Sequence, residues 1–327
     1  MTRLVSACST DDGSRRLKCL GLSLTFLFVC TIVINVQPSR ARAGMDMSAI
    51  PSGDSEPMPP LPVRMVPPAS AAADKPVSAL SEELRTSSLA LQLHVTQLEL
   101  AVYKLRALGS YSCTFTKQEA IDDGELSDEH VIDLKIRHEP FSIYMKWEEG
   151  GDEGREILYV NSSPDAKMLV KLGGVKGKLL PHLKLDPQGD LARSESRHPI
   201  TDVGLLNLTE KILAFRTRDL AHLDQVRWEM HSGDQFGDRP CYLFTIEYKS
   251  KEYESTYRKS LVWIDRDLGL PVCVQNFCWP EEDSTVKGDE LDEETLVEYY
   301  GYTDLDFART LADGDFDKSN PDYTFRR

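Results

Sequence analysis

With 327 residues, of which 41% are hydrophobic and 28% charged, the chain has the length of one or two domains and the composition of a globular protein. Its formal net charge is -15, and an acidic surface repels the phosphate backbone of nucleic acids. The composition therefore argues against nucleic-acid binding and fits a globular protein that its charge keeps soluble.

The first 43 residues have the pattern of a secretion signal. A basic segment that ends at Lys18 precedes an uncharged apolar run over residues 19–36, and an A-x-A cleavage motif follows at residues 41–43. The run is also nearly long enough to cross a bilayer as an uncleaved anchor, so a signal peptide and a signal anchor both stay open. In either case we expect export to the periplasm or the cell envelope, with the folded part near a membrane.

Residues 44–76 contain eight prolines, with serine, alanine and glycine between them. Such a composition cannot build a core, and it predicts a disordered, extended linker. The linker would hold the folded part away from a membrane or a wall.

A single α+β domain is predicted over residues 77–327. It begins with a helix over residues 82–108, which is rich in leucine and alanine and stops at Gly109. A second helix, capped by Thr201, is predicted within an insert at residues 185–222.

Outside these helices, hydrophobic and polar residues alternate with the period of a β-strand. Tyr111, Cys113 and Phe115, for example, alternate with serine and threonine. Short strands separated by brief turns predict consecutive antiparallel pairing, with one face of the sheet in solvent. The predicted strands lie near residues 111–116, 132–137, 141–148, 157–160, 168–170, 226–230, 242–248, 261–264, 272–277 and 296–302.

Four cysteines lie in the predicted domain, at Cys113, Cys241, Cys273 and Cys278. An even number in an oxidising compartment permits two disulfides in three connectivities, and buried free thiols are the alternative. The sequence does not choose between these alternatives.

No motif for catalysis or metal binding survives a check of its residues. The carboxylates within residues 313–317 have the spacing that opens a calcium loop, but Lys318 and Thr324 stand where the glycine and the bidentate glutamate belong, so we expect a solvated acidic turn there. The glycine-rich residues 173–178 lack the spacing of a phosphate-binding loop, and we interpret them as a flexible basic hairpin tip. We therefore expect no metal, no cofactor and no enzymatic activity, while a hydrolase with scattered catalytic residues stays an alternative.

All four tryptophans lie in or beside predicted strands, where core packing and cavity lining are both open. A curved sheet with a helix against it commonly encloses an apolar cavity. The candidate residues for lining such a cavity are Phe141, Ile143, Met145, Trp147, Trp228, Phe244 and Trp263.

Several blocks of sequence resemble one family. They resemble the domain of unknown function family 1571, found in planctomycete-type bacteria, and the resemblance runs from about residue 111 to residue 325. The family name implies no known activity. The blocks are residues 111–119, 137–147 and 197–205, the Trp263-Ile264-Asp265 and Gly269-Leu270-Pro271 segments, and residues 320–325.

More distantly, the layout is similar to outer-membrane lipoprotein carriers of the LolA/LolB type. The shared elements are an N-terminal helix, strands that lead into a W-x-D and G-L-P turn, and a final tyrosine-rich strand. This resemblance implies a curved antiparallel sheet, a half-open barrel, packed against the N-terminal helix and the central helical insert. It also implies an apolar concave face that holds acyl chains.

We therefore expect an extracytoplasmic, non-enzymatic protein that binds an apolar ligand, a lipid or the acyl chains of a lipoprotein, in the concave face of the sheet. One alternative is an interaction or structural protein of the cell envelope, with a filled core and an envelope protein as its partner. The other is the hydrolase, which requires a serine or a cysteine beside a histidine in a cleft.

Overall fold

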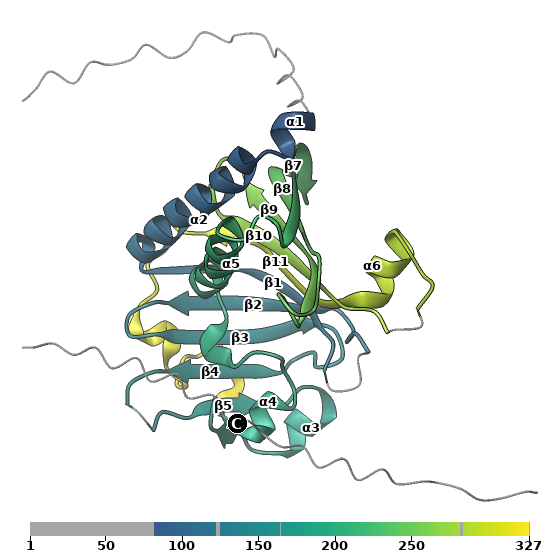
Figure 1. Cartoon of the computed structure of the whole chain (residues 1–327). Helices are drawn as coiled ribbons and strands as arrows, with labels where there is room; N and C mark the ends of the chain where they lie inside the picture. Colours follow the sequence, from purple (N-terminus) through teal and green to yellow (C-terminus); the bar gives the residue numbers. More distant parts are fainter. Residues whose placement is uncertain (1–81, 122–124, 164, 282–283, 327) are drawn as a thin grey trace, which may run out of the picture. The chain divides into compact units, whose positions relative to one another are not determined.

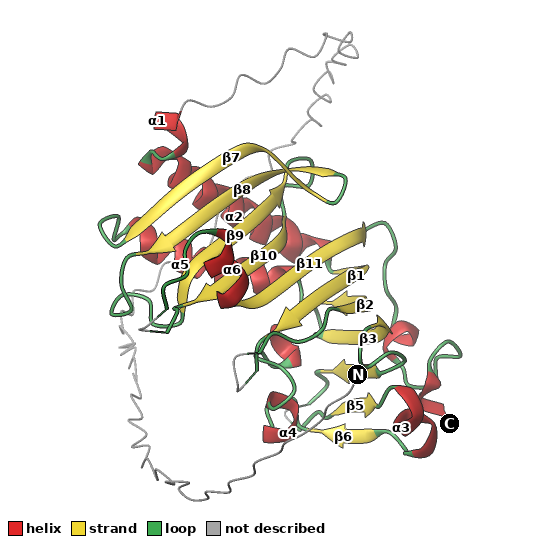
Figure 2. Ribbon diagram, turned by 90° about the vertical axis from the view of Figure 1, so that its right-hand side faces the viewer, coloured by secondary structure: helices red, strands yellow, loops and turns green. Residues whose placement is uncertain are grey.

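The computed structural model describes residues 82–121, 125–163, 165–281 and 284–326. The predicted signal over residues 1–43 and the predicted linker over residues 44–76 lie outside the described residues. Within the described ranges, eleven antiparallel strands form one sheet in the order β6-β5-β4-β3-β2-β1-β11-β10-β9-β8-β7 (Figures 1 and 2).

The sheet is open, because β6 and β7 are edge strands that do not pair with each other. The predicted curved antiparallel sheet of an α+β fold is therefore confirmed. The strands are β1 Ser110–Glu119, β2 His130–Arg137, β3 Ser142–Glu149, β4 Glu156–Val160, β5 Met168–Lys171, β6 Leu183–Leu185, β7 Val226–Phe236, β8 Arg239–Tyr248, β9 Tyr257–Asp265, β10 Pro271–Cys278 and β11 Leu296–Asp306.

The chain order explains why helices cover one face of this sheet. The first six strands run outward to the edge at β6, and the last five begin at the opposite edge with β7 and end beside β1. The connection over residues 186–225 must therefore cross the sheet, and helix α5 lies within it. Two helices, α2 (Ser88–Leu108) and α5 (Leu205–Leu220), lie on the same face, which we call the inner face (Figure 1).

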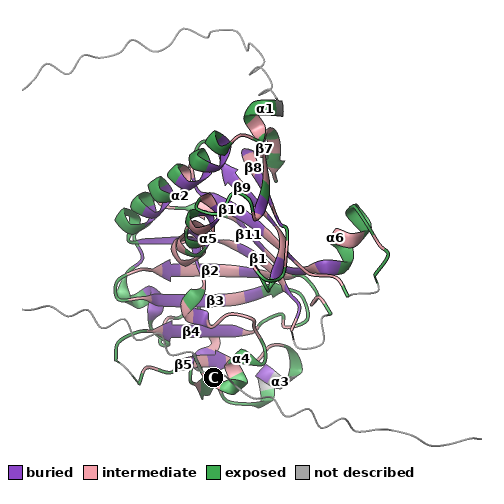
Figure 3. Cartoon of the chain, viewed as in Figure 1, coloured by how far each residue is buried: buried purple, intermediate pink, exposed green. Residues whose placement is uncertain are grey.

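The predicted N-terminal helix is present in two parts. A single turn, α1 (Glu82–Arg85), precedes α2, which ends before Gly109 as the sequence predicts. The buried side of α2 faces the sheet and its other side is exposed (Figure 3). Leu98 and Leu105 are completely buried against the inner face.

The central helix begins later than predicted. Thr201 lies in a short 3-10 helix, Ile200–Asp202, and α5 starts only after Gly204. Gly204 has a φ of +112°, and a Cβ atom there would lie 2.6 Å from Cδ1 of Ile136. The Leu205 N–H donates to the Tyr111 hydroxyl at 2.7 Å, so a tertiary contact fixes the first turn.

The prediction that one face of the sheet is in solvent is wrong at β3 and β4. Tyr144, which points away from the inner face, is only 1% exposed and stacks on Tyr323 with 3.8 Å between ring centroids. Residues from the C-terminal segment cover this outer surface. The cluster consists of Tyr144, Leu158, Leu311, Phe316, Tyr323 and Phe325.

Two smaller predictions also need correction. Residues 174–179 form a short helix, α3 (Gly174–Leu179), in place of a hairpin tip. The acidic turn at residues 313–317 is not wholly solvated, because Asp315 is buried and accepts hydrogen bonds from Arg309 and from the backbone N–H of Ala312. The remaining helices are α4 (Asp190–Arg193) and α6 (Asp289–Thr295).

All four cysteines of the folded part are free thiols. Cys113 packs into the core on the inner face, whereas Cys241 and Cys273 lie on β8 and β10 with β9 between them. Two strand spacings separate those backbones by about 10 Å. A disulfide needs Cα atoms about 4.4 to 6.8 Å apart, so this geometry favours the free-thiol alternative.

Candidate ligand-binding cavity

A cavity of about 540 Å³ lies between the inner face of the sheet and the crossing connection. The floor of the cavity is formed by the neighbouring strands from β5 to β8, so the long direction of the cavity runs across the strands. Helix α5 and the residues before it form the opposite wall. A volume of this size is typical of small-molecule sites. The cavity has an apolar end, a charged centre and a polar end, and each is built by different elements.

The apolar end lies over β3, β4 and β5. Met145 and Trp147 occupy alternate positions of β3 and therefore point to the same face. Ile157 and Met168 continue this surface on the next two strands, and Leu191 of α4 faces them across the cavity. Burial of an acyl chain against such a surface is favourable by about 25 cal/mol per Å².

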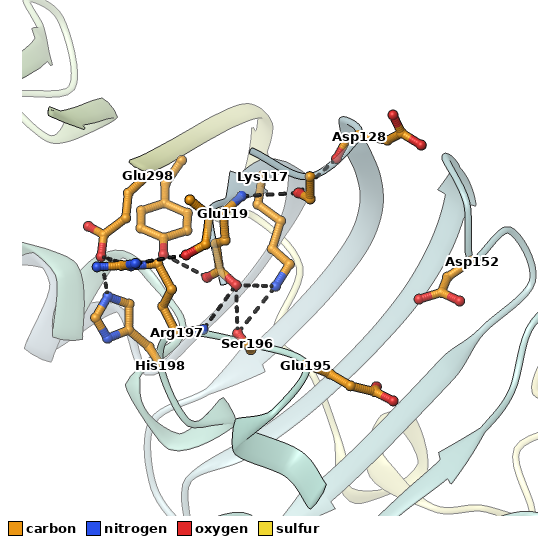
Figure 4. Close-up of polar contacts among 12 residues, drawn as sticks. Lys117, Glu119, Asp128, Asp152, Glu195, Ser196, Arg197, His198 and Glu298 are labelled. Atoms are coloured by element: carbon orange, nitrogen blue, oxygen red, sulfur yellow. Dashed lines mark hydrogen bonds and ion pairs between the residues drawn. The ribbon is translucent and has the colours of Figure 1, made fainter. Parts of the chain in front are cut away.

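Two buried carboxylates form the charged centre (Figure 4). Glu119 is the last residue of β1 and lies four residues after Phe115, so the two side chains are on the same face of the strand. Glu298 lies two residues before Tyr300 on β11, and both carboxylates therefore point to the inner face. They are 4% and 1% exposed. A buried carboxylate needs hydrogen-bonding partners of opposite charge, and the chain segment before α5 supplies several of them.

Residues Ser196, Arg197 and His198 come from the crossing connection and bind both carboxylates (Figure 4). Glu298 accepts from Arg197 Nε at 3.0 Å, and His198 Nε2 lies 2.9 Å from the same oxygen. Glu119 accepts from the Ser196 hydroxyl at 2.9 Å and from the Arg197 backbone N–H at 3.2 Å. We call these five residues the carboxylate cluster.

Strand residues complete the coordination of each carboxylate. Tyr300 donates to Glu119 at 2.6 Å, and Lys117 Nζ lies 3.0 Å from the same side chain. Glu298 accepts from the Tyr257 hydroxyl at 2.9 Å and from the Asn276 amide at 2.7 Å. The cluster therefore ties β1, β9, β10 and β11 to the connection that carries α5.

The electrostatics of the cluster keep both carboxyl groups ionised. Burial alone would raise the pKa of Glu298, but hydrogen bonds from His198 and Asn276 and the charges of His198 and Lys211 lower it to about 2. Burial likewise opposes ionisation of Glu119, and the charge of Lys117 with a hydrogen bond from Tyr300 lowers its pKa below the usual value. Neither group is suited to act as a general acid near neutral pH.

The contacts of Ser196 and His198 do not form a nucleophile–base pair. The Ser196 hydroxyl donates to Glu119, whereas His198 contacts Glu298 and Lys211. Nucleophilic catalysis by serine requires a hydrogen bond between the hydroxyl and its base. The cluster therefore orients the connection over the cavity.

The polar end lies over β8, β9 and β10. Ser260 donates to Asn276 at 2.8 Å on the floor, and Tyr257 and Tyr248 stand beside them. Arg216 of α5 closes this end from above and donates to the Tyr248 hydroxyl at 2.6 Å.

The structure brings two of the seven predicted lining residues to the cavity, Met145 and Trp147. Ile143 lies on the same face of β3 but is completely buried in the core. Phe141 precedes β3 and packs near Tyr159, with 6.3 Å between ring centroids.

The other three predicted residues lie elsewhere. Phe244 is covered by α2, where its ring stacks on His94 at 3.9 Å. Trp228 donates through Nε1 to the Ser87 carbonyl and lines a separate pocket near β7. Trp263 lies on the outer face of β9, opposite its neighbour Val262 in the core, and its Nε1 donates a hydrogen bond to Asp234. Ligand contact by any of the seven residues stays a prediction.

Sequence reasoning missed the charged residues of the cavity, although one signal was present. Lys117 and Glu119 continue the alternation of Tyr111, Cys113 and Phe115, so they occupy inward positions of β1. Charges at inward positions are unusual and mark a buried polar site.

Within the ranges that the structure describes, the chain has neither a metal-binding cluster nor a membrane-spanning helix. No group of three or more histidine, cysteine, aspartate or glutamate side chains there is arranged to hold a metal ion. No helix among the described residues has the length and apolar character needed to cross a membrane.

Comparison with known families places the chain. One family model, described as "Protein of unknown function (DUF1571)", matches residues 108–325. The chain belongs to this family. The family resemblance carried by the sequence blocks is thereby confirmed. No curated protein matches the sequence.

Among solved structures, the chain is similar to several proteins at low sequence identity, and one of them is described as a LolA superfamily protein. A LolA superfamily protein from Nitrosomonas europaea is 14% identical over 68% of this chain and 96% of its own, with a TM-score of 0.31. The lipoprotein LppX from Mycobacterium tuberculosis is 10% identical over 69% of this chain and 100% of its own, with a TM-score of 0.38. A DUF1329 family protein from Desulfovibrio piger is 12% identical over 70% and 98%, with a TM-score of 0.33.

Proposed function

We propose that this chain is an extracytoplasmic, non-enzymatic binding protein that holds an apolar ligand in the cavity beneath α5. The ligand is a lipid or the acyl chains of a lipoprotein. The observation that carries the proposal is the cavity of about 540 Å³ whose apolar end is formed by Met145, Trp147, Ile157 and Met168. The extracytoplasmic location rests on the signal pattern of residues 1–43.

The charged centre supports binding over hydrolysis. Glu119 and Glu298 are ionised and have hydrogen-bonding partners. The Ser196 hydroxyl donates to Glu119 and does not contact the His198 ring, which binds Glu298. These contacts hold the crossing connection in place over the sheet. Such a connection can act as the cover of a binding site.

One observation favours the alternative of an envelope interaction protein. Leu89, Leu93, Leu100 and Tyr103 lie along one exposed side of α2, at the spacing of a helix face. An exposed apolar stripe is typical of a contact surface. A filled core would favour the interaction function, however, and the cavity counts against it.

A fluorescence titration tests the binding function. The probe is the methyl ester of pyrene-labelled dodecanoic acid, which is uncharged and reports on the apolar end alone. The wild-type protein is expected to bind it saturably. The variant Met145→Glu should bind at least about tenfold more weakly, because it places a charge in the apolar end.

Ile143→Ala is the matched control, since Ile143 lies on the same face of β3 but outside the cavity. It should lower the free energy of unfolding by about 2–5 kcal/mol and leave the probe affinity of the folded protein unchanged. If the wild-type protein does not bind the probe saturably, the envelope interaction function becomes the better-supported of the two. If a folded Met145→Glu variant binds the probe as tightly as the wild type, the probe does not bind at the apolar end of the cavity.

A further inference from the structure

Arg216 is a buried arginine whose hydrogen-bonding capacity is only partly used. It is 2% exposed, and it lies in α5 where this helix closes the polar end of the cavity. Its Nη2 donates to the Tyr248 hydroxyl at 2.6 Å and lies 3.0 Å from Asp219. Its Nε and Nη1 have no acceptor among the described residues.

A buried N–H without an acceptor is unfavourable, and the penalty is larger for a charged group. In native proteins such a group calls for a further partner, which can be an ordered water, an ion or a bound molecule. Arg216 is one of the residues that line the cavity, so a ligand bound at the polar end lies next to its guanidinium.

A second buried group without a protein partner lies on the facing helix. His94 of α2 is completely buried, and neither ring nitrogen has a hydrogen-bond partner among the residues described. Burial and the charge of Arg216 hold the pKa of this imidazole well below its usual value, so the ring is neutral. His94 does not line the cavity, but its neutral ring leaves the charge of Arg216 without a competing cation on the facing helix.

The two ends of the cavity differ in chemistry along its length. Met145, Ile157 and Met168 form an apolar surface at the end over β3 to β5, where the Arg155–Glu195 ion pair also lines the cavity, whereas Arg216 and Ser260 stand at the end over β8 and β9. The floor spans nine neighbouring strands from β5 to β8. Neighbouring strands are about 4.8 Å apart, so the cavity is elongated enough to take an extended chain.

We propose that the ligand is a long-chain carboxylic acid, with its carboxylate bound by the free N–H groups of Arg216 and its acyl chain directed to the apolar end. This inference rests on the proposed binding function and names the ligand class. Hydrogen bonds between a guanidinium and a carboxylate are charge-assisted and stronger than neutral ones. An uncharged ester offers only weaker acceptors to the same donors.

The test compares pyrene-labelled dodecanoic acid with its methyl ester on the wild-type protein. The acid is expected to bind at least about tenfold more tightly, since a charge-assisted hydrogen bond contributes more than a neutral one. Arg216→Met should remove this preference and bind both probes with the affinity of the ester. The matched control is Arg227→Met, because Arg227 is exposed on β7 and outside this cavity; its preference should equal that of the wild type.

A second measurement does not depend on a variant that folds. Carbon-13 NMR of carboxyl-labelled dodecanoic acid bound to the wild-type protein reports the pKa of the ligand, which should lie below that of the free acid. Equal affinity of the wild type for acid and ester, or an unshifted ligand pKa, would overturn the carboxylate proposal and leave the binding function standing. Failure of both probes to bind would remove the binding function itself.

Discussion

At the scale of single residues, Glu298 is the group on which the charged centre depends most. Four side chains contact it, and they come from the crossing connection, β9 and β10. Its carboxylate is 1% exposed, so its charge is compensated by these contacts and hardly by water. Loss of the charge would leave Arg197 and its neighbours without a buried counter-ion.

The pKa of Glu298 gives its contribution to stability a defined pH dependence. The pKa is about 2 in the folded chain, against 4.5 for an ordinary glutamate. A folded-state pKa below the unfolded value means that the stabilisation is complete above about pH 4.5 and is lost as the pH falls towards about 2. Glu298→Gln should therefore lower the free energy of unfolding by about 3 kcal/mol at neutral pH.

Urea denaturation of the wild type and of Glu298→Gln between pH 7 and pH 3 measures this effect. The difference between the two proteins should narrow as the pH falls below about 4.5, where the wild-type carboxylate begins to lose its advantage. Glu293→Gln, an exposed position in α6, is the control and should have no effect at any pH. A difference that stays constant over this range would contradict the role given to the Glu298 charge.

The residues of the site were only partly predictable from the sequence. Met145 and Trp147 could be predicted as cavity residues, because their alternation in β3 shows that they share a face of the sheet. The carboxylate cluster was not, because Glu119, Arg197 and Glu298 are far apart in the sequence and meet only through strand pairing and the crossing connection. Alternation predicts a face of a strand, but it does not predict which part of that face a helix covers.

At the scale of elements, α2 has two chemically similar sides with different surroundings. Leu98 is completely buried against the inner face, whereas Leu100 is 55% exposed. Because both are leucines in the middle of one helix, they form a matched pair for separating packing from helix propensity. Their comparison also shows whether the exposed stripe contributes to the fold or is free for another purpose.

Leu98→Ala should lower the free energy of unfolding by about 2–5 kcal/mol, because it leaves a cavity in the core. Leu100→Ala should change it by less than about 0.5 kcal/mol, as is typical of exposed positions. Thermal and urea unfolding of the two variants give both values. A comparable loss for Leu100→Ala would mean that the outer side of α2 is covered in the folded protein.

The elements themselves were largely predictable, and the failures have physical reasons. Period-two alternation located the strands because one face of most of them is buried. The start of α5 was misplaced because Gly204 and the Tyr111 hydroxyl, a distant partner, decide it. The cover over Tyr144 was missed because the C-terminal segment packs through irregular structure, which has no period to detect.

At the scale of the whole molecule, the cavity follows from the order of the strands. The connection between the two edge strands has to cross an open, curved sheet, and the carboxylate cluster holds it there. The space between this connection and the sheet is filled only in part by core residues. An elongated cavity with an apolar end is the result, and ligand binding is the function that we propose for it.

Native mass spectrometry of the protein purified from its own cell envelope tests this central claim most directly. The account predicts that the wild-type protein carries a co-purifying lipid with a long acyl chain, observed as a discrete added mass, and that the folded Met145→Glu variant carries much less of it. A wild-type protein that is recovered without any bound lipid, and that takes up none when lipid is supplied, would contradict the account.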